Sequence, residues 1–143
     1  MNTKNTLYLW NKYPDLFAGR HEPITKSLIP FGFECEDGWF DLINNLCEKI
    51  VAINPDVRAS QVKEKFGTLR FYLNFYDEEV DKLIEEAETR SSYTCEVCGQ
   101  LGQLCHRGSW LKTLCEDCRV QLEYQLFDRF FDVFGITLEK KVE

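Results

Sequence analysis

The chain has 143 residues, of which 44% are apolar and 14% aromatic, and its formal net charge is −7 at pH 7. This composition is typical of a globular protein and excludes an intrinsically disordered chain. The negative charge disfavours passive adhesion to DNA or anionic lipid and would suit a basic partner. No stretch approaches the roughly 18 apolar residues of a membrane span, and residues 1–5 lack the apolar core of a signal peptide. We therefore expect a cytoplasmic protein.

The first third of the chain is expected to be irregular. Residues 1–38 hold three of the four prolines together with scattered aromatic residues, which indicates short helical turns and loops. A helix is then predicted over residues 39–53, because apolar residues recur there at helical spacing. Asp37 is placed to cap this helix, and Asn54-Pro55 would end it.

A β-hairpin and a second helix are predicted next. Residues 69–75 alternate between apolar and polar side chains, as in a half-buried strand. Residues 62–66 are its expected partner, with the turn at Phe66-Gly67, where glycine permits the backbone angles of a tight turn. The acidic run 77–79 would begin the second helix, and Arg90 falls in its last turn.

Two Cys-x-x-Cys pairs follow, Cys95 with Cys98 and Cys115 with Cys118, and sixteen residues separate the inner two cysteines. Four thiolates in two short-range pairs suit tetrahedral Zn²⁺, and this separation lies in the range of structural four-cysteine sites. A redox dithiol or ordinary buried thiols are the alternatives. Because a closed site of four cysteines has no open position for a substrate, the expected cofactor is a structural zinc ion that stabilises the lobe around it.

Cys105 and His106 lie between the two pairs. Either could replace one of the four ligands or contribute to a second metal site, but the paired cysteines already satisfy a tetrahedral ion. A histidine here also suggests an HNH-type nuclease, a family whose motif histidines flank a longer hairpin and in which a further histidine usually begins the helix. His106 is the only histidine in this part of the chain, and Arg119 follows Cys118, so that interpretation has little support in the sequence.

The zinc lobe is predicted to contain a hairpin and a long helix. Residues 101–106 and 109–114 would pair around Arg107-Gly108. The helix would run over residues 117–134 and end at Gly135. Its apolar residues cover roughly 200° of the circumference, about twice the width of the apolar stripe on a surface helix, so we expect burial on two sides. The helix would be either the central helix of the fold or an interface with a partner protein or with a second copy of this chain. Knuckle, hairpin and helix in this order resemble a treble-clef zinc finger.

Basic and aromatic side chains form a candidate nucleic-acid face. They lie on the polar side of the predicted hairpin and around the zinc lobe, at Lys63, Lys65, Arg70, Tyr72, Arg107 and Lys112. Such a surface could stack bases and neutralise phosphates. Mixed faces of this kind are also ordinary solvated sheet surface, so both interpretations stay open.

Four carboxylates gather near the start of the first predicted helix, at Glu34, Glu36, Asp37 and Asp41. Closely spaced carboxylates can bind a metal ion or share a proton. They equally serve as loop solvation and a helix cap, the interpretation that we favour. Cys35 and Cys47 are expected to be buried as small hydrophobic residues. We therefore assign no catalytic residue.

Four segments stand out as a set: Gly32-Phe33-Glu34-Cys35, Asp37-Gly38-Trp39, the run QVKEKFGTLRFY over residues 61–72, and Cys95-Glu96-Val97-Cys98-Gly99. In this order they resemble a family of small uncharacterised bacterial and bacteriophage proteins. The resemblance implies a phage or prophage origin and an intracellular setting in the bacterial host. It implies no particular activity, because none is established for that family.

The predicted fold class is α+β. An α+β domain over residues 1–92 would contain the irregular segment, a helix, the hairpin and a helix, and a treble-clef-like zinc lobe with a long C-terminal helix would follow over residues 93–143. The leading hypothesis is an intracellular zinc-containing binding protein, a phage or prophage accessory factor that binds or inhibits a host protein. The alternatives are a nucleic-acid-binding regulator and, third, a nuclease or hydrolase acting through the carboxylates of residues 34–41.

Overall fold

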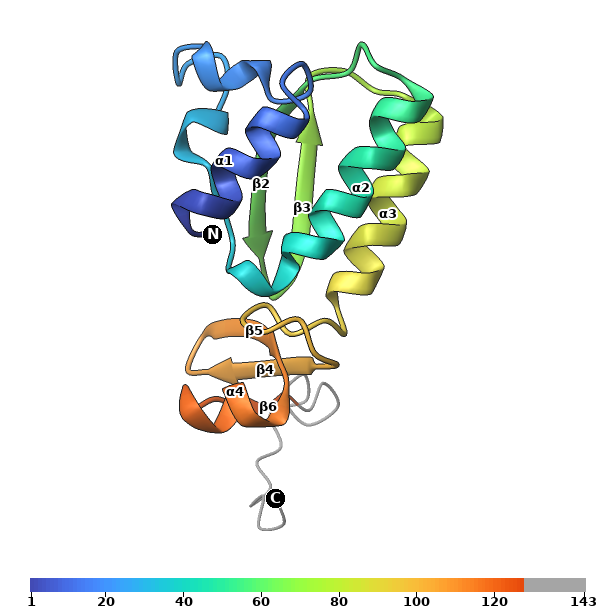
Figure 1. The fold of residues 1–143 in the computed structure, drawn as a ribbon. Helices are drawn as coiled ribbons and strands as arrows, with labels where there is room; N and C mark the ends of the chain where they lie inside the picture. The colour runs from blue at the N-terminus through green and yellow to red at the C-terminus, as the bar shows by residue number, and fades with distance from the viewer. Residues whose placement is uncertain (128–143) are drawn as a thin grey trace.

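The computed structural model of the chain describes residues 1–127. Its upstream part combines a three-stranded sheet with three helices, which confirms a mixed α+β fold (Figure 1). The strands are β1 (Phe33–Glu34), β2 (Ala59–Lys65) and β3 (Thr68–Leu73), and the helices are α1 (Thr3–Lys12), α2 (Phe40–Ile53) and α3 (Glu78–Ser91). Strand β2 lies between the other two, parallel to β1 and antiparallel to β3. Helices α2 and α3 run side by side in opposite directions (Figure 1).

The prediction of short turns over residues 1–38 is wrong at its start, where α1 is a regular ten-residue helix, and is confirmed after it. Three 3-10 helices connect α1 to α2: η1 (Ala18–His21), η2 (Ile29–Phe31) and η3 (Asp37–Trp39). Pro30 stands in the first residues of η2, where its missing N–H leaves no helical hydrogen bond unmade. These turns bring Phe17 and Ile29 into the hydrophobic core.

The main core lies against one face of the sheet. Val62 of β2 pairs with Phe71 of β3 and with Phe33 of β1, so the three side chains share a face. The ring of Phe17 packs edge-on against that of Phe33, with 5.1 Å between the centroids. Helix α2 closes the core with its buried residues Ile43, Leu46, Cys47 and Ile50. The apolar side chains whose spacing predicted this helix therefore form the stripe that packs into the core.

Helix α2 confirms the helix predicted over residues 39–53, but not its cap. Trp39 occupies the N-cap position and makes no side-chain cap hydrogen bond. Asp37 instead accepts hydrogen bonds at Oδ1 from the N–H of Asn2, at 2.9 Å, and from the side chain of Asn5, at 3.0 Å. The predicted capping role of Asp37 is wrong because η3 separates it from the helix. Its carboxylate holds the start of α1 in place.

The predicted hairpin and the helix after it are confirmed. Strands β2 and β3 meet at Phe66 and Gly67, whose φ angles of 54° and 86° are both positive, as in a type I′ turn. Asp77 caps α3 by accepting a 3.0 Å hydrogen bond from a backbone N–H in the first turn. At the other end of α3, the Ser91 hydroxyl accepts a 2.9 Å hydrogen bond from the N–H of Leu69. The helix therefore covers part of the outer edge of β3.

The downstream part is a small lobe with its own sheet. It comprises β4 (Gln103–Arg107), β5 (Trp110–Leu114), α4 (Glu116–Gln121) and β6 (Gln125–Leu126). Strand β4 lies between β5 and β6 and is antiparallel to both. The predicted hairpin is confirmed, with its turn at Gly108-Ser109, one residue later than expected. A second, smaller cluster of buried residues lies here, formed by Cys95, Cys105, Leu114, Cys118 and Tyr124.

The long helix predicted over residues 117–134 is wrong in its described part, because α4 ends at Gln121. The chain turns through Glu123, at φ 60°, and Tyr124 donates its N–H to the carbonyl of Arg119 at 2.9 Å. This bond across a left-handed residue is a Schellman ending, which stops a helix. The turn buries the side chain of Tyr124 in the lobe and lets β6 pair with β4. The remainder of the predicted helix lies outside the described residues.

The two hydrophobic clusters lie on either side of residue 92, the predicted domain boundary. That each part folds as a domain of its own stays a prediction, and so does a homodimer seam along the C-terminal segment. Within residues 1–127, no helix has both the length and the apolar character that crossing a membrane requires.

Candidate metal centre

The four cysteines of the two Cys-x-x-Cys pairs come together in the downstream lobe. Cys95 and Cys98 lie in the knuckle after α3, Cys115 is the N-cap residue of α4, and Cys118 lies in its first turn. One sulfur from each lies within 4.8 Å of all the others, and Cys98 Sγ is 3.5 Å from Cys115 Sγ. Sulfurs bound tetrahedrally at about 2.3 Å from a zinc ion would be roughly 3.8 Å apart. The predicted cluster is thus present at metal-ligand distances.

Backbone hydrogen bonds in the cluster favour the thiolate form of Cys95, whereas burial raises the pKa of Cys118. Gly99 turns the chain after the knuckle at φ 83°, and its N–H bonds to the carbonyl of Cys95 at 2.9 Å. Burial opposes ionisation of Cys95, but backbone hydrogen bonds from residues 97, 98 and 115 outweigh it and lower the pKa of this thiol. The N–H of Cys118 also points at Cys115 Sγ, at 3.4 Å. Such N–H···S contacts stabilise the deprotonated form that binds metal.

Cys105 and His106 lie on β4, and within residues 1–127 neither belongs to a group of three or more potential metal ligands. The Cys105 thiol is buried and donates to the carbonyl of Gln103 at 3.2 Å. The His106 ring lies edge-on to that of Phe127, with 5.9 Å between centroids. These positions are those of hairpin side chains, the interpretation that the spacing of the four paired cysteines favoured.

A buried glutamate attaches the knuckle to the upstream domain. Glu96, which lies between the first two cysteines in the sequence, is only 1% exposed. Its carboxylate accepts from the N–H of Glu36 at 3.1 Å and from Lys112 Nζ at 3.3 Å, and its carbonyl accepts from the N–H of Gly38 at 2.7 Å. Burial raises the pKa of Glu96, and Lys112 opposes this shift. We call the set Gly38, Gly67, Glu96, Lys112 and Thr113 the joint.

The β2–β3 turn forms the second half of the joint. The buried hydroxyl of Thr113 donates to the carbonyl of Gly67 at 2.7 Å. Trp39 reinforces the contact by donating its indole N–H to the carbonyl of Thr94 at 2.9 Å. The joint was not predicted from the sequence, because a glutamate between two ligands has no periodicity that marks it as buried. Gly38, Gly67 and Glu96 nevertheless each lie in a segment that the sequence analysis singled out.

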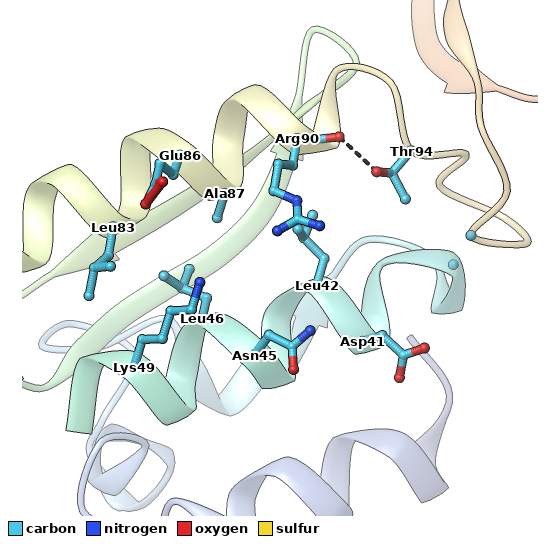
Figure 2. Close-up of a pocket in the computed structure, with 12 residues that line it drawn as sticks. Asp41, Leu42, Asn45, Leu46, Lys49, Leu83, Glu86, Ala87, Arg90 and Thr94 are labelled. Carbon is cyan, nitrogen blue, oxygen red and sulfur yellow. Dashed lines mark hydrogen bonds between the residues drawn. The ribbon is translucent and has the colours of Figure 1, made fainter. Parts of the chain in front are cut away.

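A groove of about 230 Å³ runs between α2 and α3 and ends at the joint (Figure 2). Its apolar lining is Leu42, Leu46, Leu83 and Ala87, and its polar side chains are Asp41, Asn45 and Lys49 from α2 with Glu86 and Arg90 from α3. The Thr94 hydroxyl donates to the carbonyl of Arg90 at 2.7 Å, where the chain leaves α3 (Figure 2). Both walls carry both signs of charge, so the groove has no net preference for an anion or a cation.

The carboxylates of residues 34–41 make separate contacts. In the described part of the chain, none of them belongs to a potential metal-binding group. Glu34 accepts a hydrogen bond from Gln61 at 3.0 Å, Asp37 holds α1, and Asp41 alone lines the groove. Asp37 anchors the backbone of α1 and does not cap α2, so the capping part of the favoured interpretation is wrong.

The candidate nucleic-acid residues fall into two patches. Lys63 and Arg70 lie opposite each other on the face of the sheet away from the core, and Arg70 donates to the Thr68 hydroxyl at 2.8 Å. In the metal lobe, Arg107 stacks over the ring of Tyr124 at 4.7 Å, and Lys112 is bound to Glu96. The lobe patch is thus engaged in internal contacts, whereas Lys65 and Tyr72 are exposed on the sheet.

Comparison with known protein families, with curated proteins and with solved structures found no match to this chain. The metal centre therefore stands on its own geometry.

Cys35 and Cys47 are expected to resist alkylation in the folded protein. Both are buried in the main core, where burial raises the pKa of Cys35 to about 12 and also raises the pKa of Cys47. At pH 8 the thiolate fraction of such a group is about 10⁻⁴. Peptide mapping after iodoacetamide treatment in excess chelator should find the exposed Cys98 labelled and these two unlabelled until denaturant is added. Labelling of Cys35 or Cys47 at the rate of Cys98 would contradict their burial.

Proposed function

We propose that the protein is a zinc-stabilised binding protein whose partner is another protein. The observation that carries this proposal is an aromatic surface at the end of β3. Tyr72, Phe75 and Tyr76 are 40%, 45% and 74% exposed and line one shallow hollow of about 310 Å³. Aromatic residues are enriched at the centres of protein interfaces, where they contribute large contact areas. We call these three residues the aromatic surface.

In this proposal the four cysteines hold Zn²⁺ in a structural role. A cluster of four sulfurs supports zinc over a hard cation, since thiolates are soft ligands. The ion would stabilise a lobe whose own buried cluster is small, and the order of knuckle, hairpin and short helix supports a treble-clef-like arrangement. The joint would then make the lobe and the upstream domain one rigid support for the aromatic surface.

The biological setting of the proposal comes from the sequence resemblance alone. It implies a phage or prophage accessory factor in the bacterial cytoplasm, and the partner would then be a host protein. The acidic chain favours a host protein with a basic surface.

A capture experiment tests this function. The tagged, zinc-loaded chain is expected to retain a stoichiometric protein from bacterial lysate, with or without nuclease. The double variant Phe75→Ser with Tyr76→Ser should reduce capture at least tenfold, because it removes the centre of the aromatic surface. Tyr93→Ser, which changes a residue 47% exposed on another surface, is the matched control and should capture normally. Equal capture by the double variant would contradict the assigned surface, and prey lost on nuclease treatment would contradict protein binding.

A nucleic-acid-binding regulator is the second candidate, and the adjacent Lys63 and Arg70 beside the exposed Tyr72 favour it. It predicts binding to single-stranded oligonucleotide with a steep salt dependence that Lys63→Gln with Lys65→Gln reduces. Fluorescence anisotropy at two salt concentrations measures this directly. The internal contacts of Arg107 and Lys112 are the reason that we rank it second.

A further inference from the structure

The hollow that the aromatic surface lines is also lined by two acidic side chains. It lies between the end of β3 and the first turns of α3. Core residues Phe71 and Ile84 contribute to its base, the aromatic surface contributes three rings, and the carboxylates are those of Asp77 and Asp81. Rings and carboxylates converging on one hollow make a different chemical environment from the mixed charges of the α2–α3 groove.

The carboxylate of Asp77 is held in its ionised form. It accepts hydrogen bonds from the side-chain amide of Asn54, at 2.7 Å, and from the N–H of Val80, at 3.0 Å. Both contacts lower the pKa of Asp77, the amide contact most. Asp81 follows one helical turn later, on the same side of α3. Two carboxylates therefore flank the hollow, and hydrogen bonds favour the ionised form of Asp77.

Acidic side chains surround the exposed ring of Tyr76. The pKa of the Tyr76 phenol is raised by local desolvation and then by the charges of Asp81, Glu78 and Glu85. The nearby cation Lys82 pairs with Glu78, with 4.0 Å between Nζ and Oε1. A ring face is itself negative at its centre, so rings and carboxylates attract the same kind of ligand.

We propose that this hollow binds the guanidinium group of an arginine side chain presented by the protein partner. A planar guanidinium can stack on a tyrosine ring while its N–H groups bond to a carboxylate, which an ammonium does less well. The net charge of −7 complements a basic partner over the whole surface. The inference rests on the proposed function and names the chemistry of the partner at that same surface.

A titration of the full, zinc-loaded chain with Nα-acetyl-arginine methylamide tests the pocket apart from any partner. In amide NMR spectra the shifts should concentrate at residues 72–81 and saturate with a Kd of about 1–10 mM, the range of a single side chain. The neutral isostere, the citrulline derivative, and the leucine derivative should produce no saturating shifts there, and the lysine derivative should bind more weakly than the arginine derivative. Asp81→Asn should weaken arginine binding at least fivefold, whereas Asp56→Asn, an exposed carboxylate outside the hollow, should leave it unchanged.

The outcomes separate this inference from the proposed function. No saturation by the arginine derivative, or equal binding of the citrulline or leucine derivative, overturns the guanidinium pocket even if capture from lysate succeeds. Equal binding of the lysine derivative overturns the preference for a planar cation. Arginine binding that Asp81→Asn weakens supports the pocket, and if lysate capture then fails, only the proposed protein-binding function is lost.

Discussion

Replacing Cys95 by serine is expected to abolish stoichiometric zinc binding and to unfold the lobe of residues 93–127. The residue is fully buried beside the three other cysteines of the cluster. Structural zinc contributes on the order of 10 kcal/mol to the folding of small metal-dependent units, and the buried cluster of this lobe contains few residues besides the cysteines. The upstream core should persist with a lower melting temperature, because it loses the contacts of the joint.

The measurement combines zinc content per chain with amide NMR spectra and thermal melting. Cys105→Ala is the matched control, since it removes another buried thiol of the same lobe that lies outside the cluster. It should retain one equivalent of zinc and the dispersed signals of β4 and β5. Native-like melting and full zinc content in the Cys95→Ser variant would contradict the structural role of the cluster.

Replacing Gly38 by alanine is expected to destabilise the protein by about 3 kcal/mol or more, at the upper end of the cost of overpacking. A Cβ atom at this position would lie within 3.0 Å of the backbone carbonyls of Cys95 and Glu96, which cannot move aside as a flexible side chain could. The two parts of the molecule must then separate. Separation breaks the hydrogen bond from the N–H of Gly38 to the carbonyl of Glu96 and that from the N–H of Glu36 to the Glu96 carboxylate, whereas Lys112 stays beside Glu96 in the same lobe.

Urea unfolding of the zinc-loaded chain measures this effect. Gly108→Asn is the matched control, because asparagine tolerates its φ of 62° and no atom of the described residues lies within 4 Å of the added Cβ. The control should stay within about 1 kcal/mol of the parent. A Gly38→Ala variant as stable as the control would show that the joint is not closely packed.

The elements that the sequence predicted correctly are those with a local physical signature. Residues 69–73 alternate because β3 is buried on one face, and Gly67 provides the left-handed turn that β2 and β3 need. The four cysteines could be grouped from their spacing alone, because a tetrahedral ion requires two short-range pairs that a longer segment brings together. In each case the chemistry that produces the pattern acts within a few residues or at a fixed spacing.

The features that the sequence did not predict depend on contacts between distant residues. The apolar residues after Cys118 have helical spacing, but Tyr124 is buried because the chain reverses and β6 pairs with β4. Glu123 takes the left-handed position that glycine usually occupies, so no residue type marked the end of α4. Glu96 is charged, and only the structure shows that Lys112 and the N–H of Glu36 compensate its burial.

X-ray absorption at the zinc edge, on the full chain loaded with one equivalent of zinc, tests the metal centre most directly. Zinc bound by the four clustered cysteines predicts four sulfur neighbours at about 2.3 Å and no nitrogen or oxygen in the same shell. A nitrogen neighbour would place a histidine such as His106 in the site, and a shell dominated by oxygen would show that the four thiolates do not hold the ion. Either result would contradict a closed zinc centre of four cysteines.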